Sequence, residues 1–299
     1  MRDFHSQYQD WLNLIEKALP DLFPQTPASE GGAVVEAARY SLLAGGKRVR
    51  PVLALAVADM LGIKTDRAMP YAGAIEMIHT YSLIHDDLPC MDDDDWRRGR
   101  KTCHIVYGEA LAVLAGDALL NRAYELLFEA IDTRQPASRE AALLIAAAAG
   151  SQGMIGGQAL DLTAEKKKIS DKEMRQLHMM KTGALLKAPV MAMVKLADIK
   201  ADSQIAFERF AAAIGLAFQI QDDILDVVSD REQMGKTTGK DERDSKSTYV
   251  SLYGLDGARR QLNQAIALAY DYLGQLQERD GLDSTFLSGL TDYLLHREK

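Results

Sequence analysis

The run HDDLPCMDDDDWRR, residues 85–98, holds six aspartates within ten positions and ends in two arginines. Carboxylates this close repel one another, by about 1 kcal/mol per pair at ~4 Å in water and by about 4 kcal/mol near a protein surface. A fold tolerates them only on an open surface or around multivalent cations. A second acidic run, QIQDDILD at residues 219–226, lies far downstream. The two runs predict two walls of one site for hard cations, so the helices that carry them must converge.

The donor chemistry of the acidic runs favours magnesium. The first run has neither the central glycine nor the closing glutamate that a calcium-binding EF-hand loop needs. A set of carboxylate oxygens suits Mg²⁺ or Mn²⁺, and Mg²⁺ in proteins usually keeps several waters and is completed by substrate phosphates. The site therefore implies a phosphorylated ligand. The alternative for the first run is a plain acidic surface.

The polar side chains of the second run lie on one face of a predicted helix. Gln219, Asp222, Asp223 and Asp226 have the spacing i, i+3, i+4 and i+7, which places them in one stripe. The residues just before them are mostly apolar, so the stripe is expected to face the interior or a cleft. Taken alone, it is equally typical of a solvated helix face; the first acidic run favours the cation site.

A basic run supplies the complementary charge. The run GGKRVRP, residues 45–51, places two glycines and three cations just before a predicted helix, which is the setting of a phosphate-binding seat. It lacks the glycine spacing of a P-loop. Arg97 and Arg98 follow the first acidic run directly, and His79 lies two helical turns before Asp86. The alternatives are a solvated basic loop and a structural histidine.

Further lysines are candidates for binding a second phosphate. Lys181 belongs to the run KTG inside a predicted helix, and Lys236, Lys240 and Lys246 lie in a long loop over residues 229–250. Because exposed lysines are common on protein surfaces, each of them is a weak indication by itself.

Hydrophobic periodicity predicts an almost wholly helical chain. Pro20 is expected to end the first helix, and glycines at 45–46 and at 62 are expected to end the next ones. No alternating strand run of useful length occurs. The predicted helices span residues 4–19, 33–44, 51–61, 70–88, 109–132, 138–160, 170–196, 203–228, 256–279 and 284–297.

The chain has no repeat, low-complexity tract or long linker, and its longest irregular segments, residues 89–108 and 229–250, are also its most charged. Loops of this length in a compact helical body are usually functional. We therefore expect one all-α domain over residues 1–299, a large bundle whose buried helices surround a central cavity.

Composition narrows the classes of partner and compartment. With 43 acidic and 35 basic residues, the net charge of −8 argues against a general nucleic-acid-binding surface. Cys90 and Cys103 form neither a metal-ligand spacing nor a disulfide framework, which favours a reducing compartment. The N-terminal residues lack the apolar core of a signal peptide, and no run of 18 uncharged apolar residues occurs. We expect a cytoplasmic protein without a membrane span.

Taken together, these motifs resemble the short-chain trans-isoprenyl diphosphate synthases, and most closely the bacterial members that make farnesyl diphosphate. The resemblance runs from about Tyr40 to Tyr249, and its motifs are highly specific as a set. No catalytic motif departs from the family pattern. The resemblance rests on the runs at residues 45–51, 79–87, 86–98, 156–158, 181–183 and 219–226.

The resemblance implies mostly antiparallel helices around a deep cavity, usually in a homodimer, and a role for each motif. Three Mg²⁺ ions, with Mn²⁺ as a substitute, would be held by Asp86, Asp87, Asp92, Asp222, Asp223 and Asp226. The diphosphate of the allylic substrate, dimethylallyl or geranyl diphosphate, would also contact Arg97, Lys181, Lys236 and Lys246. Isopentenyl diphosphate would occupy a seat formed by Gly46, Lys47, Arg50, His79 and Arg98.

The implied reaction is a head-to-tail condensation by a prenyltransferase. Metals and cations stabilise the charge on the departing diphosphate. The Thr182 hydroxyl, the Lys181 carbonyl and Gln219 would then stabilise the allylic cation. The double bond of isopentenyl diphosphate would attack this cation. The proton is expected to go to the released diphosphate, since no dedicated base is evident.

Product length is expected to depend on Tyr81 and Ser82, which lie five and four residues before Asp86. A prenyl chain anchored at the aspartates must extend past this part of the helix, where one turn is ~5.4 Å long. In the family, a bulky residue here, combined with two extra residues between Asp87 and Asp92, goes with a fifteen-carbon product. The expected product is (2E,6E)-farnesyl diphosphate, with geranyl and geranylgeranyl diphosphate as the alternatives.

More distant alternatives are a class I terpene cyclase and a non-catalytic partner subunit. A cyclase normally carries a second motif of the Asn/Asp-Ser/Thr-Glu type and lacks the seat of Lys47, Arg50 and His79. A non-catalytic subunit is expected to have lost acidic ligands, whereas both acidic runs are present here. A metal-free acidic scaffold is the remaining alternative.

Overall fold

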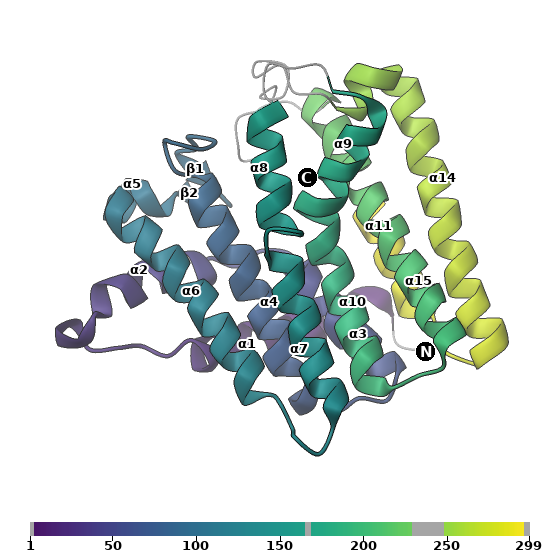
Figure 1. The fold of residues 1–299 in the computed structure, drawn as a ribbon, viewed down its shortest axis with the longest axis horizontal. Coiled ribbons are helices and arrows are strands. Elements are labelled where there is room, and N and C mark those ends of the chain that lie inside the picture. Colours follow the sequence, from purple (N-terminus) through teal and green to yellow (C-terminus); the bar gives the residue numbers. More distant parts are fainter. Residues whose placement is uncertain (1–2, 165–168, 229–247, 296–299) are drawn as a thin grey trace.

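The computed structural model describes residues 3–164, 169–228 and 248–295. In these ranges the chain folds almost entirely into helices, which run mostly antiparallel to one another in one bundle (Figure 1). This architecture confirms the predicted all-α class. In chain order the helices are α1 (Phe4–Leu22), η1 (Ala28–Glu30), α2 (Gly32–Leu42), α3 (Val49–Met60), α4 (Thr65–Asp86), α5 (Cys103–Tyr107), α6 (Glu109–Glu129), α7 (Pro136–Ala149), α8 (Met154–Ala164), α9 (Asp171–His178), η2 (Met179–Gly183), α10 (Ala184–Ala197), α11 (Ala201–Val228), α14 (Tyr249–Asp280) and α15 (Thr285–Leu295).

The centre of the bundle is formed by α3, α4 and α10, most of whose residues are buried. Helix α3 is buried without interruption from Pro51 to Ala58, and α10 from Ala188 to Val194. Helices that are apolar around their whole circumference are expected in such a position. Helix α4 packs against α3, α6 and α10, while α11 packs along α14.

Helices α4 and α11 carry the two acidic runs to the same end of the molecule. Helix α4 ends at Asp86 and leads into an antiparallel hairpin of β1 (Trp96–Arg97) and β2 (Arg100–Lys101). In Figure 1 this hairpin and the C-terminal end of α11 both lie at the upper end of the bundle. The convergence that the two runs predict is therefore present in the fold.

Three helix boundaries differ from those that the sequence predicts. Helix α1 does not end at Pro20, because Nη1 of Arg39 donates to the carbonyl oxygens of Pro20 (3.0 Å) and Phe23 and caps the last turn. Helix α4 begins at Thr65, before its proline at position 70. Helix α14 begins at Tyr249 with a capping box, but non-helical angles at Gly254 (φ 67°, ψ 165°) kink it, so the part after the kink begins near the predicted residue 256.

The helix predicted over residues 138–160 is two helices, α7 and α8. The backbone turns between them: Gly150 has an extended ψ of −169°, and its carbonyl oxygen accepts from the N–H of Gly153 (2.9 Å). The prediction over residues 170–196 is closer, because α9, η2 and α10 follow one another directly, but η2 is a π-helical turn. The segment 89–108, predicted to be irregular, contains β1, β2 and α5.

One described stretch, residues 136–164, has the length and the mean hydropathy (1.2) of a membrane-spanning segment. Its interruption after Ala149 divides it into α7 with 14 residues and α8 with 11 residues. A spanning helix needs about 20 consecutive residues. Neither helix has that length.

Candidate active site

The first acidic wall forms at the C-terminal end of α4, where the chain folds back. The N–H of Asp92 donates to the carbonyl oxygen of Asp86 (2.8 Å), and Asp93 takes a left-handed conformation with φ 51°. This turn places Asp92 close to Asp86. Burial raises the pKa of Asp86 to about 6, with Lys181 opposing the rise and Asp92 adding to it.

Asp87 is turned toward Arg97 at the start of the hairpin. Its side chain is 4% exposed, and its two carboxylate oxygens accept from Nε of Arg97 at 2.7 and 2.9 Å. Asp94 lies 3.7 Å from the same guanidinium. Burial raises the pKa of Asp87, although the hydrogen bonds from Arg97 act in the opposite direction. Arg97 therefore connects the end of α4 to β1.

The three aspartates of the second wall have different surroundings. Asp222 and Asp226 are half-buried on α11. Asp223 is 3% exposed; its Oδ1 accepts from Nε2 of Gln219 (2.9 Å), and its Oδ2 accepts from the backbone N–H of Tyr249 (2.8 Å). Asp223 thus ties the acidic stripe of α11 to the first turn of α14.

The π-helical turn η2 links the two walls. On one side, Nζ of Lys181 lies 2.5 Å from Oδ2 of Asp161 on α8, and its charge also acts on Asp86. On the other side, Oγ1 of Thr182 donates to Oε1 of Gln219 (2.9 Å). Turns of this type are rare and occur frequently at functional sites. The predicted residues Lys181, Thr182 and Gln219 therefore come together between the acidic runs.

Asp161 is a residue of this site that the sequence analysis misses. It lies four residues after Gly157, on the same helix as the motif at residues 156–158, and this spacing is the signal in the sequence. A Cβ at Gly157 would lie only 2.2 Å from the backbone nitrogen of Lys181, so α8 and η2 meet backbone to backbone. This close approach lets the short side chain of Asp161 reach Lys181.

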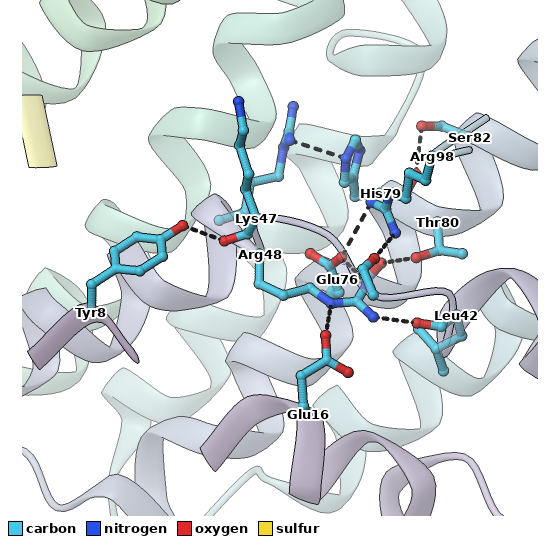
Figure 2. Close-up of polar contacts among 12 residues, drawn as sticks. Tyr8, Glu16, Leu42, Lys47, Arg48, Glu76, His79, Thr80, Ser82 and Arg98 are labelled. Carbon is cyan, nitrogen blue, oxygen red and sulfur yellow. Dashed lines mark hydrogen bonds and ion pairs between the residues drawn. The ribbon is translucent and has the colours of Figure 1, made fainter. Parts of the chain in front are cut away.

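The basic run forms a seat beside His79 on α4 (Figure 2). Nη1 of Arg50 lies 3.2 Å from Nε2 of His79, and Nη1 of Arg98 donates to the carbonyl oxygen of Gly45 (2.5 Å). Gly46 has a φ of 130°, and a Cβ there would lie 2.9 Å from Cζ of Arg98. The backbone conformation therefore requires glycine at this position, and any side chain would also have to displace the guanidinium of Arg98.

The seat presents its positive charge through Lys47, Arg50 and Arg98. The hydroxyl of Tyr8 donates to the backbone carbonyl oxygen of Lys47, while the Lys47 ammonium extends away from this bond (Figure 2). Burial, together with the charges of Arg50 and Arg98, pushes the pKa of His79 well below its usual range. His79 is therefore neutral and accepts a hydrogen bond from Arg50.

Tyr81 and Ser82 lie on α4 between the seat and the first wall. Tyr81 is 5% exposed, its ring packs edge-on against His85 with 5.6 Å between centroids, and its hydroxyl has no hydrogen-bond partner among the described residues. Burial raises the pKa of Tyr81, with Tyr124 of α6 adding to the shift. Oγ of Ser82 donates to the carbonyl oxygen of His79 (2.9 Å). The tyrosine ring thus lies toward α6, whereas the small serine side chain bonds to the backbone of α4 itself.

The donor set of the two acidic runs fits magnesium. In the part of the chain that the structure describes, no three carboxylate, imidazole or thiolate groups form a closed metal cage. Mg²⁺ does not need such a cage, because it binds one or two carboxylates and completes its shell with water and substrate phosphate. The predicted phosphate ligands Lys236 and Lys246 lie outside the described residues.

Comparison with known proteins relates the chain to enzymes that make prenyl diphosphates. Residues 32–278 match the family model described as polyprenyl synthetase. The chain is 43% identical over 301 residues to the farnesyl diphosphate synthase of Escherichia coli (strain K12), covering 99% of this chain and 100% of that protein. It is 47% identical over 232 residues to the geranylgeranyl diphosphate synthase of Cyanophora paradoxa, covering 76% of this chain and 77% of that protein.

A solved structure with a similar fold is the geranyltransferase from Helicobacter pylori complexed with magnesium and isoprenyl diphosphate. The two structures superimpose with a TM-score of 0.88 and 33% sequence identity, covering 99% of each chain. The family match extends over most of the chain, and the two acidic walls and the basic seat lie within it. The chain therefore belongs to the polyprenyl synthetase family.

Proposed function

We propose that the chain is a magnesium-dependent trans-prenyltransferase. It condenses isopentenyl diphosphate with dimethylallyl and then geranyl diphosphate, head to tail, to give (2E,6E)-farnesyl diphosphate and diphosphate. One observation carries the proposal: η2 lies between the acidic walls, with Lys181 acting electrostatically on Asp86 and Thr182 bonded to Gln219, and the cationic seat adjoins the helix of the first wall. A reaction between two diphosphates, one of which departs, requires this pairing of a metal-binding region with a separate anion-binding region.

The allylic diphosphate binds between the acidic walls in this proposal. Bound Mg²⁺ neutralises the charge that develops on the departing diphosphate. Lys181 and Arg97 add cationic contacts, together with Lys236 and Lys246. The carboxylates for three Mg²⁺ ions, with Mn²⁺ as a substitute, come from Asp86, Asp87, Asp92, Asp222, Asp223 and Asp226.

Isopentenyl diphosphate binds at the seat formed by Gly46, Lys47, Arg50, His79 and Arg98. Three cations facing one diphosphate provide charge-assisted hydrogen bonds, which are stronger than neutral ones. His79 contributes no charge, because its pKa is lowered, and instead holds the guanidinium of Arg50 in place.

The residues of η2 act on the reacting carbon. Since the hydroxyl of Thr182 donates its hydrogen bond to Oε1 of Gln219, the lone pairs of Oγ1 are left for an electron-poor carbon, and the carbonyl oxygen of Lys181 adds a second dipole. Departure of the allylic diphosphate leaves an allylic cation. The π electrons of isopentenyl diphosphate form the new carbon–carbon bond, and a proton then passes to the released diphosphate.

Farnesyl diphosphate is the product that the side chains beside the first wall support. Tyr81 fills the space toward α6 with a buried ring, and Ser82 leaves the neighbouring position small. The chain is about equally similar to a relative named for a fifteen-carbon product and to one named for a twenty-carbon product. Overall identity therefore does not distinguish the two product lengths, and the proposal rests on these two side chains.

We further propose that residues 1–299 form a single domain and act as a homodimer in the cytoplasm. The dimer is supported by large exposed apolar side chains on each of four consecutive helices, α5 to α8. Large exposed apolar patches mark sites of protein association. These side chains are Ile105, Val106, Val113, Leu114, Phe128, Leu143, Ile155, Leu160 and Leu162.

Product chromatography tests the proposed function. The purified protein is incubated with isopentenyl diphosphate, each allylic starter in turn, and Mg²⁺. We expect farnesyl diphosphate, and we expect its formation to stop when EDTA removes the metal. A cyclic hydrocarbon would indicate a terpene cyclase instead, and turnover that requires a second polypeptide would indicate a non-catalytic subunit.

A further inference from the structure

Arg48 lies between Lys47 and Arg50 in the basic run but does not belong to the seat. Its side chain has 0% exposure, and its backbone is left-handed, with a φ of 47° at the residue before α3. This conformation is unfavourable for a residue with a Cβ, so tertiary contacts must hold it. The bend turns the Arg48 side chain into the protein, while the Lys47 side chain extends in another direction (Figure 2).

Three helices meet at the Arg48 guanidinium (Figure 2). Nε donates to Oε1 of Glu16 on α1 (2.7 Å), and Nη1 donates to Oε1 of Glu76 on α4 (2.6 Å). Nη2 donates to the carbonyl oxygen of Leu42 at the end of α2 (2.6 Å). A lysine ammonium cannot reproduce this planar three-way fork. The guanidinium therefore fixes the loop after α2 against α1 and α4.

Glu76 extends the same network to the rest of the seat. It lies one helical turn before His79 on α4, and its Oε1 is 3.9 Å from Nη2 of Arg98. Its backbone carbonyl oxygen accepts from Oγ1 of Thr80 (2.8 Å). The Arg48–Glu76 pair is thus next to Lys47 in the chain, one helical turn from His79 on α4, and 3.9 Å from the guanidinium of Arg98.

Stability does not explain this ion pair. Glu76 is 1% exposed, and its Oε2 has no hydrogen-bond partner among the described residues. A buried ion pair with an unsatisfied oxygen costs desolvation energy that its attraction hardly recovers. The geometry that the pair imposes on its neighbours is the better explanation for its presence.

We propose that Arg48 and Glu76 are positioning residues for the isopentenyl diphosphate seat, an inference that rests on the proposed function of that seat. Neither residue touches the substrate. The pair holds the loop of residues 45–50 in its bent form, and the bend keeps Lys47, Arg50 and Arg98 at the spacing of a diphosphate. Loss of the pair therefore weakens binding of isopentenyl diphosphate and leaves the allylic site intact.

Steady-state kinetics of Arg48→Lys and Glu76→Gln test this inference, with isopentenyl and geranyl diphosphate varied separately. Arg48→Lys keeps the charge and loses the fork, whereas Glu76→Gln keeps the shape and loses the charge. We expect each variant to raise the KM for isopentenyl diphosphate about tenfold, with kcat and the KM for geranyl diphosphate changed less than about twofold. Because the two residues act as one unit, the double variant should be no worse than the more impaired single variant.

Arg122→Lys is the matched control. Arg122 lies on α6, outside the seat. Its guanidinium also donates both to a carboxylate, that of Glu129 (2.8 Å), and to a backbone carbonyl oxygen, that of Leu22 (2.9 Å). Its replacement should leave both KM values unchanged, even where Tm falls. If Arg48→Lys does not fold, Glu16→Gln takes its place, because the Glu16 side chain is 33% exposed and its loss is milder.

Two outcomes would overturn the inference: an unchanged KM for isopentenyl diphosphate in the folded variants, or equal rises in both KM values. The second outcome would mean general damage to the fold. A wild-type protein that makes no product would refute the proposed function itself, so the two failures are distinguishable.

Discussion

Asp222 and Asp223 are adjacent in the chain, but their replacement should have different effects. Asp223 is buried and accepts from Gln219 and Tyr249, whereas Asp222 is half-buried. Asp223→Asn exchanges an acceptor oxygen for a donor and should cost about 1–3 kcal/mol of the free energy of unfolding. Asp222→Asn should lower that free energy by less than Asp223→Asn does, because Asp222 is only half-buried. It should lower kcat roughly a hundredfold or more, since it removes a metal ligand.

Urea unfolding curves and Mg²⁺ titrations of activity, measured on both variants, separate these effects. Equal losses of stability would contradict the different surroundings of the two carboxylates. Near-normal activity of Asp222→Asn, with Mg²⁺ as the only metal, would count against the second acidic wall.

Tyr81 and Ser82 allow a test of product length by exchange of side-chain volume. Tyr81→Ala removes a buried ring, so products should lengthen to geranylgeranyl diphosphate or beyond. Ser82→Phe should shorten them toward geranyl diphosphate. Tyr124→Phe, which removes only a hydroxyl from the neighbouring helix, should keep the fifteen-carbon product. The readout is product chromatography under excess isopentenyl diphosphate, and a Tyr81→Ala product that still stops at fifteen carbons places the limit elsewhere.

His178 should make stability depend on pH. Burial lowers its pKa from 6.5 to about 4, and its Nδ1 has no hydrogen-bond partner among the described residues. As pH falls through the window between these values, the unfolded state binds a proton that the folded state does not. The free energy of unfolding is therefore highest above pH 6.5 and should fall by roughly 1 kcal/mol between pH 7 and pH 5.5. Urea unfolding at both pH values should show a smaller fall in His178→Gln, and an equal fall would assign the effect to other groups.

The site was predictable residue by residue only where a motif carries the signal. Gln219 and Asp222 form a stripe, and Lys181 belongs to a motif. Asp161 has only its spacing from Gly157 as a signal, because its pairing with Lys181 depends on the close approach of two backbones. The inward direction of Arg48 is equally hidden, since its neighbours in the basic run have the same charge and point elsewhere. The metal and substrate roles of these residues stay predictions.

At the scale of elements, the contact between α8 and η2 is the most sensitive to substitution. Gly157→Ala would place a Cβ 2.2 Å from N and 2.5 Å from Cα of Lys181. Because backbone must move, Lys181 and Thr182 are displaced, and kcat with geranyl diphosphate should fall about a hundredfold or more. Gly274→Ala on α14 is the control, since no atom lies within 4 Å of its new Cβ.

The control should stabilise the protein by about 0.5–1 kcal/mol, because alanine suits a helix better than glycine, and it should leave kcat unchanged. Thermal unfolding and initial rates measured on both variants provide the comparison. A Gly157→Ala enzyme with normal kcat would show that η2 tolerates a wider separation from α8.

The helices could be predicted from periodicity, whereas the continuation of one helix past a proline could not. The core helices α3 and α10 are apolar over long runs, which a local pattern reveals. The break at residues 150–153 falls on the run Gly-Ser-Gln-Gly, a local turn signal that the prediction of one helix over residues 138–160 does not use. The continuation of α1 past Pro20 depends on Arg39 from another helix. Tertiary contacts overrode local preference at Pro20, whereas the break after α7 follows local preference.

At the scale of the whole molecule, the exposed apolar side chains on α5 to α8 predict a mass of twice the 32.9 kDa chain. Light scattering during gel filtration measures this mass. The double variant Leu114→Glu/Phe128→Glu should be monomeric, since it places two charges in the proposed interface, where Phe128 is 70% exposed. Leu268→Glu on α14, where the side chain is 48% exposed, should leave the mass unchanged. A monomeric wild-type protein would refute the homodimer.

The turn at residues 150–153 lies near the middle of the chain and separates the predicted site residues into an N-terminal and a C-terminal group. The part of the chain before the turn carries the first acidic wall and the cationic seat, and the part after it carries η2 and the second wall. Helix α10, which follows the turn, packs against α3, α4 and α7, which precede it. A gene split at this turn would encode two inactive polypeptides that regain activity only by finding each other. Recovery of activity on mixing the two polypeptides would therefore report that both are present and have assembled.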